Sequence, residues 1–116
     1  MKHVLIVEDH DDHAFLLQSI LTKMVFLTST TINVFHVLDC VRSKSVCAVI
    51  LDIHLPGMSG DLIIKEIRNI DQAIPIIMVT ANVDDKMRIK CLQLGANYYV
   101  VKPYESKDIQ GIFRQY

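Results

Sequence analysis

Four continuous apolar runs along the chain each end on a polar side chain. The runs are Val4–Val7, Cys47–Leu51, Ile74–Val79 and Tyr98–Val101. The residues that follow them are Glu8 and Asp9, then Asp52, Thr80 and Lys102. Continuous apolar runs are typical of strands buried on both faces, as in a parallel sheet covered by helices. If the runs are parallel strands, these polar groups meet at one edge of the sheet, where open parallel sheets bind ligands.

Amphipathic segments separate the runs and predict helices. The first helix is expected to be capped by Asp11-Asp12, and another begins after Gly60. A further helix opens at Asp84-Asp85 and stops at Gly95. The apolar positions expected to face the core are Ala14, Leu17, Leu21 and Met24; Ile63, Ile67 and Ile70; Met87, Cys91 and Leu94; and Ile109, Ile112 and Phe113.

Two elements rest on weaker patterns. Residues Thr31–Phe35 alternate polar and apolar side chains, which suits an edge strand, and a helix is expected from Val37 to Ser43. The last helix contains Gly111, which costs roughly 1 kcal/mol relative to alanine. Its pattern still holds at Tyr116, so we allow for further chain beyond it. Five strands alternating with helices predict a doubly wound α/β domain, because right-handed crossovers admit few topologies.

Composition favours one compact domain with an apolar core. The chain has 116 residues, of which 51% are hydrophobic and 22% charged. A net charge of −1 gives no general attraction to nucleic acid or to anionic membranes, and no apolar stretch is long enough to cross a bilayer. Cys40, Cys47 and Cys91 are odd in number and lack metal-ligand spacing. We therefore expect a cytoplasmic domain with reduced cysteines.

The polar edge has the donor set of a cation site. Asp9 and Asp52 are expected on neighbouring strands with Glu8 beside them. Two like charges about 4 Å apart repel by roughly 4 kcal/mol at an effective dielectric constant of 20. Such a cluster needs a cation or protons, and oxygen ligands in an open site favour Mg²⁺. Lys102 is placed to offset one charge, and Thr80 supplies a hydroxyl group.

The same groups suit the transfer of a phosphoryl group. A metal ion and a lysine neutralise the equatorial phosphoryl oxygens while a carboxylate oxygen attacks in line. The product of that attack is an aspartyl phosphate. Asp52, at the centre of the edge, is the better candidate for the nucleophile, and Asp9 is the better candidate for the metal ligand.

Four motifs at these strand ends resemble the receiver domain of two-component response regulators, the CheY-like family. The motifs are Leu5–Asp9, Leu51–Gly60, Val79–Ala81 and Val101–Tyr104. The resemblance covers essentially the whole chain, so residues 1–116 are expected to form a single receiver domain. It implies a flavodoxin-like fold, with a five-stranded parallel sheet in the order 2-1-3-4-5. It also implies a cis peptide bond between Lys102 and Pro103.

The resemblance implies a phosphoacceptor and a metal site. Asp52 would accept the phosphoryl group and contribute to the Mg²⁺ site. Asp9 would bind Mg²⁺ directly, and Glu8 would bind it chiefly through water. The backbone carbonyl of His54 would supply a further ligand.

The resemblance also implies a switch. Thr80 and Lys102 would hold the phosphoryl oxygens, and Tyr99 matches the aromatic residue that turns inward as the threonine moves toward the phosphate. The acidic pair departs from the commonest pattern of the family, and two other residues lie at positions that vary within it. Glu8 replaces the commoner aspartate of the acidic pair, and His54 and Asn82 occupy positions that the family uses to tune phosphate lifetime.

The function implied is a phosphorylation-controlled signalling switch rather than an enzyme. The domain would take the phosphoryl group from a phosphohistidine on a sensor histidine kinase or a phosphotransfer protein, by self-catalysed transfer, and lose it by autodephosphorylation. The output face would comprise the last two helices and the strand that holds Tyr99. That face would act on an output domain or a target protein, and a phosphorylation-dependent dimer is compatible with it. Direct contact with nucleic acid or membrane is not expected of this domain.

Three alternatives remain at the level of the sequence. A small phosphatase that uses an aspartyl phosphate would need an acid two residues after Asp52, where His54 stands. A flavodoxin-type binding module would need a phosphate-cradling loop after the first strand, where Glu8 and Asp9 stand. His10 and His13 are three residues apart, a spacing that suits a zinc or nickel ion.

Overall fold

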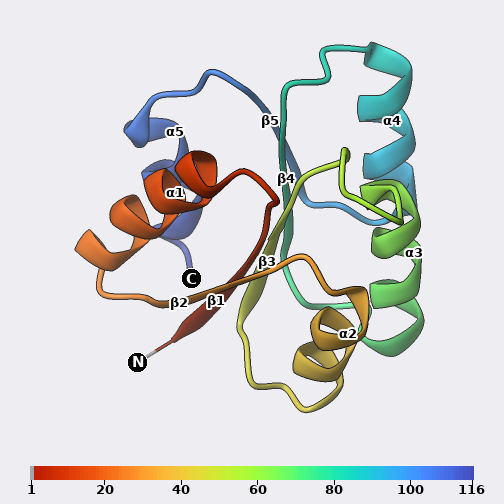
Figure 1. Ribbon diagram of the computed structural model, residues 1–116, viewed down its shortest axis with the longest axis horizontal. Helices are drawn as coiled ribbons and strands as arrows, with labels where there is room; N and C mark the ends of the chain where they lie inside the picture. The colour runs from red at the N-terminus through yellow and green to blue at the C-terminus, as the bar shows by residue number, and fades with distance from the viewer. Residues whose placement is uncertain (1) are drawn as a thin grey trace.

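The computed structural model describes residues 2–116 and shows one parallel sheet between two layers of helices (Figure 1). Its five strands are β1 (His3–Val7), β2 (Leu27–Thr31), β3 (Ala48–Leu51), β4 (Ile76–Thr80) and β5 (Tyr98–Val101). Its helices are α1 (Asp11–Lys23), α2 (Val34–Arg42), α3 (Gly60–Ile70), α4 (Asp85–Leu94) and α5 (Ser106–Phe113). All strand pairs are parallel, and the order β2-β1-β3-β4-β5 confirms the predicted fold. No helix among residues 2–116 has the length and apolar character needed to span a membrane.

The sheet separates two apolar clusters, and alternate residues of β1, β3, β4 and β5 enter opposite clusters. In β1, Leu5 and Val7 belong to the cluster shared with α2, α3 and α4, whereas Val4 and Ile6 belong to the cluster shared with α1 and α5. Figure 1 shows these two sets of helices on opposite faces of the sheet. The strands β1, β3 and β4 are almost wholly buried, as their continuous apolar sequences predict. Strand β5 is only partly buried although its sequence is apolar, because it forms an edge of the sheet.

The second strand lies earlier in the chain than its sequence pattern predicted. It spans Leu27–Thr31 rather than Thr31–Phe35, although its position at the sheet edge is as expected. The reason is Asn33, whose side chain accepts hydrogen bonds from the N–H groups of Phe35 and His36 and so caps α2. The helix therefore begins at Val34, three residues before the predicted start.

The ends of the other helices are close to prediction, with one correction. The N-cap of α1 is His10, whose side chain makes no capping bond, so Asp11-Asp12 lies in the first turn. Negative charge there is favourable because it faces the positive end of the helix dipole. Asp84 caps α4 and Gly95 ends it with φ of 121°. The last helix forms over Ser106–Phe113 despite Gly111.

Candidate functional site

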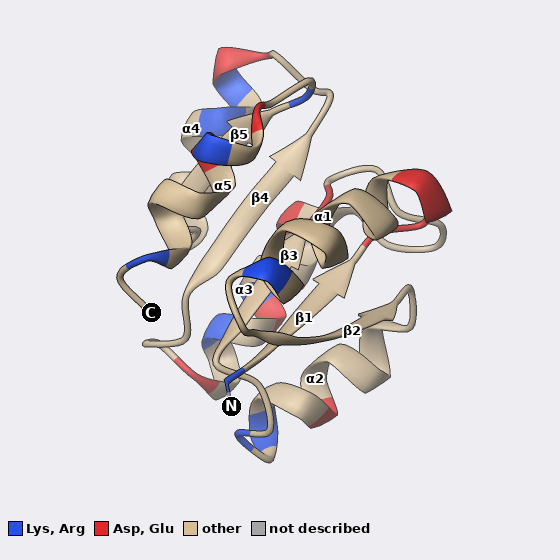
Figure 2. Ribbon diagram, turned by 90° about the vertical axis from the view of Figure 1, so that its left-hand side faces the viewer, with Lys and Arg blue, Asp and Glu red and all other residues tan. Residues whose placement is uncertain are grey.

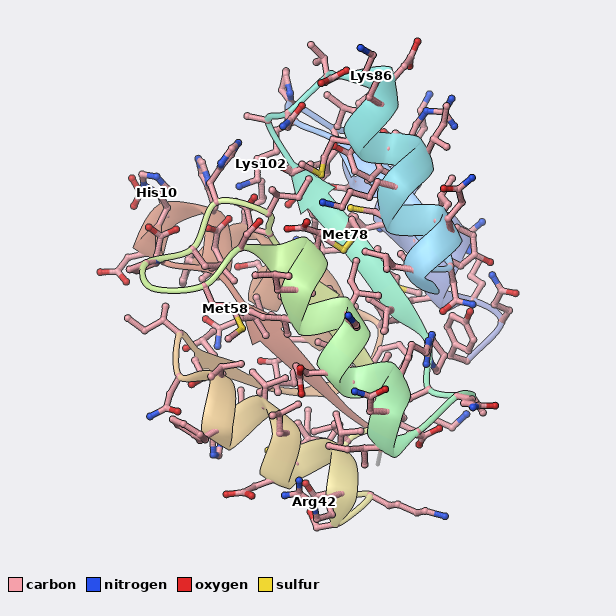
Figure 3. All side chains as sticks on the ribbon, turned by 90° about the vertical axis from the view of Figure 1, so that its right-hand side faces the viewer. His10, Arg42, Met58, Met78, Lys86 and Lys102 are labelled. Carbon is pink, nitrogen blue, oxygen red and sulfur yellow. The ribbon has the colours of Figure 1, made fainter. Side chains whose placement is uncertain are left out.

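The polar residues predicted at the strand ends come together around the ammonium group of Lys102. Its Nζ lies 2.5 Å from Oε1 of Glu8 and 3.1 Å from Oδ2 of Asp52. Carboxylate oxygens of Glu8, Asp9 and Asp52 all lie within 4.8 Å of one another. Figure 3 shows Lys102 beside the tip of β4, and Figure 2 shows further acidic residues at the start of α1. The predicted cluster at one edge of the sheet is therefore present.

Backbone hydrogen bonds extend the sheet into the site and fix the positions of two of its residues. The N–H of Asp52 donates to the carbonyl of Val7 at 3.2 Å, which ties the residue after β3 to β1. The N–H of Lys102 donates to the carbonyl of Thr80 at 2.8 Å, which ties the residue after β5 to β4. The bond from Lys102 to Pro103 is cis, as predicted. The charged side chains thus project from the ends of a rigid ladder.

Asp52 is buried but remains ionised. Burial raises the pKa of its carboxyl, but the hydrogen bond and charge of Lys102 outweigh this effect. The hydroxyl of Thr80 and the N–H of His54, at 3.3 Å from Oδ1, add to the stabilisation of the carboxylate. The pKa of Asp52 consequently lies below its ordinary value, and at neutral pH the side chain is in its nucleophilic form.

This lowered pKa predicts a dependence of stability on pH. Because the folded pKa of Asp52 is below the unfolded value, its contribution is present above the unfolded pKa and is lost as the pH falls through the folded pKa. In urea denaturation from pH 5 downward, we expect the free energy of unfolding to fall less steeply in Asp52→Asn than in the wild type.

The control for this pH series is Asp39→Asn, which removes a surface carboxylate paired with Arg42. Such exposed pairs contribute little, so its slope should stay near that of the wild type. Equal slopes for Asp52→Asn and the wild type would contradict the assignment of a depressed pKa to Asp52.

The acidic cluster fits a hard divalent cation. Glu8 and Asp52 are buried, Asp9 is exposed, and all three supply oxygen ligands. Three carboxylates beside one ammonium leave an excess of negative charge that a divalent ion neutralises. Mg²⁺ prefers such oxygen ligands and retains several waters, which the exposed side of Asp9 permits. The role of the His54 backbone carbonyl as a metal ligand remains a prediction. The N–H of the same residue already contacts Asp52.

A short chain of hydrogen bonds leads from the site toward β5. Thr80 is fully buried, and its Oγ1 accepts from the N–H of Asn82 at 3.2 Å. The hydroxyl of Tyr99 donates to the carbonyl of Asn82 at 2.8 Å, and burial raises the pKa of this phenol to about 12. The side chain of Asn82 accepts from the N–H of Asp84, the cap of α4. Thr80, Tyr99 and α4 are therefore connected through one residue.

His13 belongs to the site, although its sequence pattern suggested another role. Its Nδ1 lies 2.8 Å from Nζ of Lys102 and 3.4 Å from Oε1 of Glu8. The rings of His10 and His13 are close, with centroids 4.9 Å apart. Nδ1 of His13 faces an ammonium group, which disfavours a zinc or nickel ion at that atom.

Gly60 supports the loop that follows Asp52, a role that its place before a helix did not reveal. Its N–H donates to the carbonyl of Ile53 at 2.8 Å. A Cβ at this position would overlap the carbonyl oxygen of Asp52 and lie 2.8 Å from Cα of Ile53. Only glycine therefore allows α3 to begin this close to the end of β3.

A protein-family model identifies the family of this chain. Residues 4–114 match the family model of the response regulator receiver domain. The chain belongs to the response regulator receiver domain family. The match includes every strand-end residue of the site.

This receiver domain is similar to segments of longer curated proteins. One relative is a probable transcriptional regulator, ycf27, of Cyanidium caldarium. The two sequences are 35% identical over 109 residues, which cover 94% of this chain and 43% of that protein. Another relative is hybrid signal transduction histidine kinase D of Dictyostelium discoideum. The identity is 32% over 108 residues, and this alignment covers 91% of this chain and 7% of that protein. The chain thus spans less than half the length of these relatives.

Solved structures have the same fold as this receiver domain. A CheY-like receiver domain protein of Methanospirillum hungatei JF-1 superposes with a TM-score of 0.90 at 22% identity, over 99% of this chain and 92% of that one. The receiver domain of a sensor histidine kinase from Pseudomonas aeruginosa PAO1 gives a TM-score of 0.86 at 26% identity, over 98% and 95%. That neighbour has a magnesium ion coordinated in its active-site cleft.

Proposed function

We propose that this receiver domain accepts a phosphoryl group on Asp52, in a Mg²⁺-dependent transfer from a phosphohistidine of a sensor histidine kinase or phosphotransfer protein. The observation that carries the proposal is the state of Asp52, a buried carboxylate held ionised by Lys102 beside two further acids. A cationic group and a carboxylate cluster at the nucleophile are what phosphoryl transfer requires. In this role the domain is a cytoplasmic switch that modifies itself.

The transfer exchanges one bond to phosphorus for another. A carboxylate oxygen of Asp52 attacks the phosphorus atom in line, the bond from phosphorus to the donor imidazole breaks, and the imidazole nitrogen keeps the electron pair and takes up a proton. Lys102 and Thr80 donate to the phosphoryl oxygens. Glu8, Asp9 and Asp52 would hold Mg²⁺, which would supply positive charge that offsets the charge on those oxygens. Water reverses the modification by hydrolysing the aspartyl phosphate.

A cavity beside Lys102 offers a path for the donor imidazole. It has a volume of about 420 Å³ and lies between α1 and the segments that follow β4 and β5. Its lining residues are His13, Leu16, Ala81, Lys102, Pro103 and Tyr104. Most of these side chains are apolar, so a planar ring can enter while Lys102, at the wall of the cavity, remains in contact with Asp52.

The signal would leave through the bonds that join Thr80 to Tyr99. A phosphoryl group on Asp52 would accept a hydrogen bond from the hydroxyl of Thr80 and draw that hydroxyl away from the N–H of Asn82. The carbonyl of Asn82 holds the hydroxyl of Tyr99. Movement of Thr80 would therefore release Tyr99 to turn inward and remodel the face of α4, β5 and α5. Ile89 and Leu92 on α4 are exposed and offer apolar area to an output domain, a target protein or a second copy. A full population shift from 1:99 to 99:1 needs roughly 5.5 kcal/mol of differential stabilisation.

Intact mass measurement tests the proposal. After incubation with acetyl phosphate and Mg²⁺, the wild type should gain the mass of one phosphoryl group, and Asp52→Asn should gain none. Chelation of Mg²⁺ with EDTA should prevent the gain.

The matched control is Asp61→Asn, which removes another buried carboxylate. Asp61 of α3 pairs with Lys90 of α4 at 2.7 Å. This variant should be modified like the wild type. A gain that survives Asp52→Asn would contradict the proposal, and steady turnover of unrelated phosphoesters would favour a phosphatase instead.

A further inference from the structure

We propose that His13 is a positioning residue for Lys102: its imidazole holds the ammonium group in place when Mg²⁺ and the phosphoryl group engage the other partners of that lysine. The proposal rests on the proposed function, and it concerns a residue of α1 rather than a strand end. His13 is half exposed, with 48% of its side chain accessible, and it forms part of the cavity wall beside the site.

The donors of Lys102 are fully used in this structure. An ammonium group has three N–H donors and no acceptor. Its three partners are Oε1 of Glu8 at 2.5 Å, Nδ1 of His13 at 2.8 Å and Oδ2 of Asp52 at 3.1 Å. An incoming phosphoryl oxygen can therefore receive a hydrogen bond from Lys102 only if one of these partners is released.

The short contact fixes which nitrogen of His13 carries the proton. Because the ammonium group only donates, Nδ1 must present its lone pair to Lys102, and the ring proton is on Nε2. The 3.4 Å approach of Nδ1 to Glu8 is then no hydrogen bond, since neither atom holds a proton for the other. His13 acts on Lys102 as a neutral acceptor.

The three partners differ in what a divalent cation does to them. Glu8 and Asp52 are members of the acidic cluster, the one group of at least three potential ligands found within residues 2–116. A cation held by this cluster would compete with Lys102 for the carboxylate oxygens of Glu8 and Asp52. His13 lies outside the cluster and carries no negative charge, so it keeps its bond. When Glu8 turns to the cation, one N–H of Lys102 becomes free for the phosphoryl group while Nδ1 of His13 prevents the side chain from leaving.

Two substitutions of similar size separate this role from simple packing. In His13→Asn, the amide oxygen stands the same number of bonds from Cα as Nδ1, so the acceptor is kept. In His13→Leu the acceptor is absent. At saturating Mg²⁺ we expect phosphorylation by acetyl phosphate to be about fivefold slower in His13→Leu, the factor for one typical hydrogen bond, and near the wild-type rate in His13→Asn.

A spectroscopic readout makes the test independent of phosphorylation. The ammonium group of a lysine gives a ¹H–¹⁵N NMR signal when hydrogen bonds slow its exchange with water. With Mg²⁺ present, the signal of Lys102 should be visible in the wild type and in His13→Asn and lost in His13→Leu. Persistence of the signal in His13→Leu, or loss of it in both variants, would overturn the proposal.

The control is His10→Ala, which removes the imidazole whose centroid lies 4.9 Å from that of the His13 ring. It should retain both the signal of Lys102 and the wild-type rate. The two hypotheses fail separately. If the wild type is never phosphorylated, the proposed function fails while the NMR comparison still decides the role of His13. If the wild type is phosphorylated and both His13 variants react at equal rates, only the positioning role fails.

Discussion

Gly60→Ala is expected to lower the free energy of unfolding by about 3 kcal/mol, a large effect for one methyl group. The added Cβ overlaps the carbonyl oxygen of Asp52 and approaches Cα of Ile53 to 2.8 Å. Both obstacles are backbone atoms, which cannot rotate away as a side chain would. Relief requires α3 to move from the end of β3, and that movement also breaks the bond from the N–H of Gly60 to Ile53. Urea denaturation monitored by circular dichroism measures the loss.

A second glycine provides the matched control. Gly111 lies inside α5, and a Cβ there would meet no atom within 4 Å. Gly111→Ala should therefore stabilise the protein, by roughly 0.5 to 1 kcal/mol, because alanine has the higher helix propensity. Equal effects of the two substitutions would show that the contact at Gly60 does not govern the packing of α3.

Lys102→Met is expected to destabilise the metal-free protein by about 3 kcal/mol, since it leaves the buried carboxylates of Glu8 and Asp52 without their cation. Methionine keeps an apolar side chain of similar length, so the change reports mainly on charge. Mg²⁺ can replace part of the lost positive charge. We therefore expect the thermal midpoint of this variant to rise more steeply with Mg²⁺ concentration than that of the wild type, as linkage requires for tighter binding.

Lys107→Met is the control for charge removal. Lys107 pairs with Glu105 on the surface of α5, where both side chains are about three-quarters exposed. Its removal should change stability by less than about 0.5 kcal/mol and leave the response to Mg²⁺ unaltered. A metal-free Lys102→Met protein as stable as the wild type would mean that the acidic cluster does not depend on Lys102 for neutralisation.

The central part of the fold follows from local sequence because strands buried on both faces have continuous apolar sequences. The runs that became β1, β3 and β4 contain no polar residue before their ends, and no helix surface would need so long an apolar stretch. Strand β2 has no such continuous apolar sequence. It is rich in threonine and serine at a sheet edge, and the alternation after Thr31 imitates a strand although Asn33 already caps a helix there.

The site was predictable to the extent that it depends on topology. Parallel strands bring their carboxyl ends to one edge, so Glu8, Asp52, Thr80 and Lys102 were placed together without any knowledge of side-chain geometry. The contact of His13 with Lys102 was not predictable in this way, because it joins residues 89 apart through the packing of α1 against the segment after β5. The role of Gly60 likewise depends on an atomic separation that no sequence pattern specifies.

The connection through Asn82 has an evolutionary consequence. Its bonds to Thr80 and Tyr99 use the N–H and carbonyl of the main chain, and only the bond to Asp84 uses its side chain. Any amino acid except proline can supply both main-chain groups. Natural variation at this position can therefore retune the cap of α4 while the link between threonine and tyrosine is inherited intact.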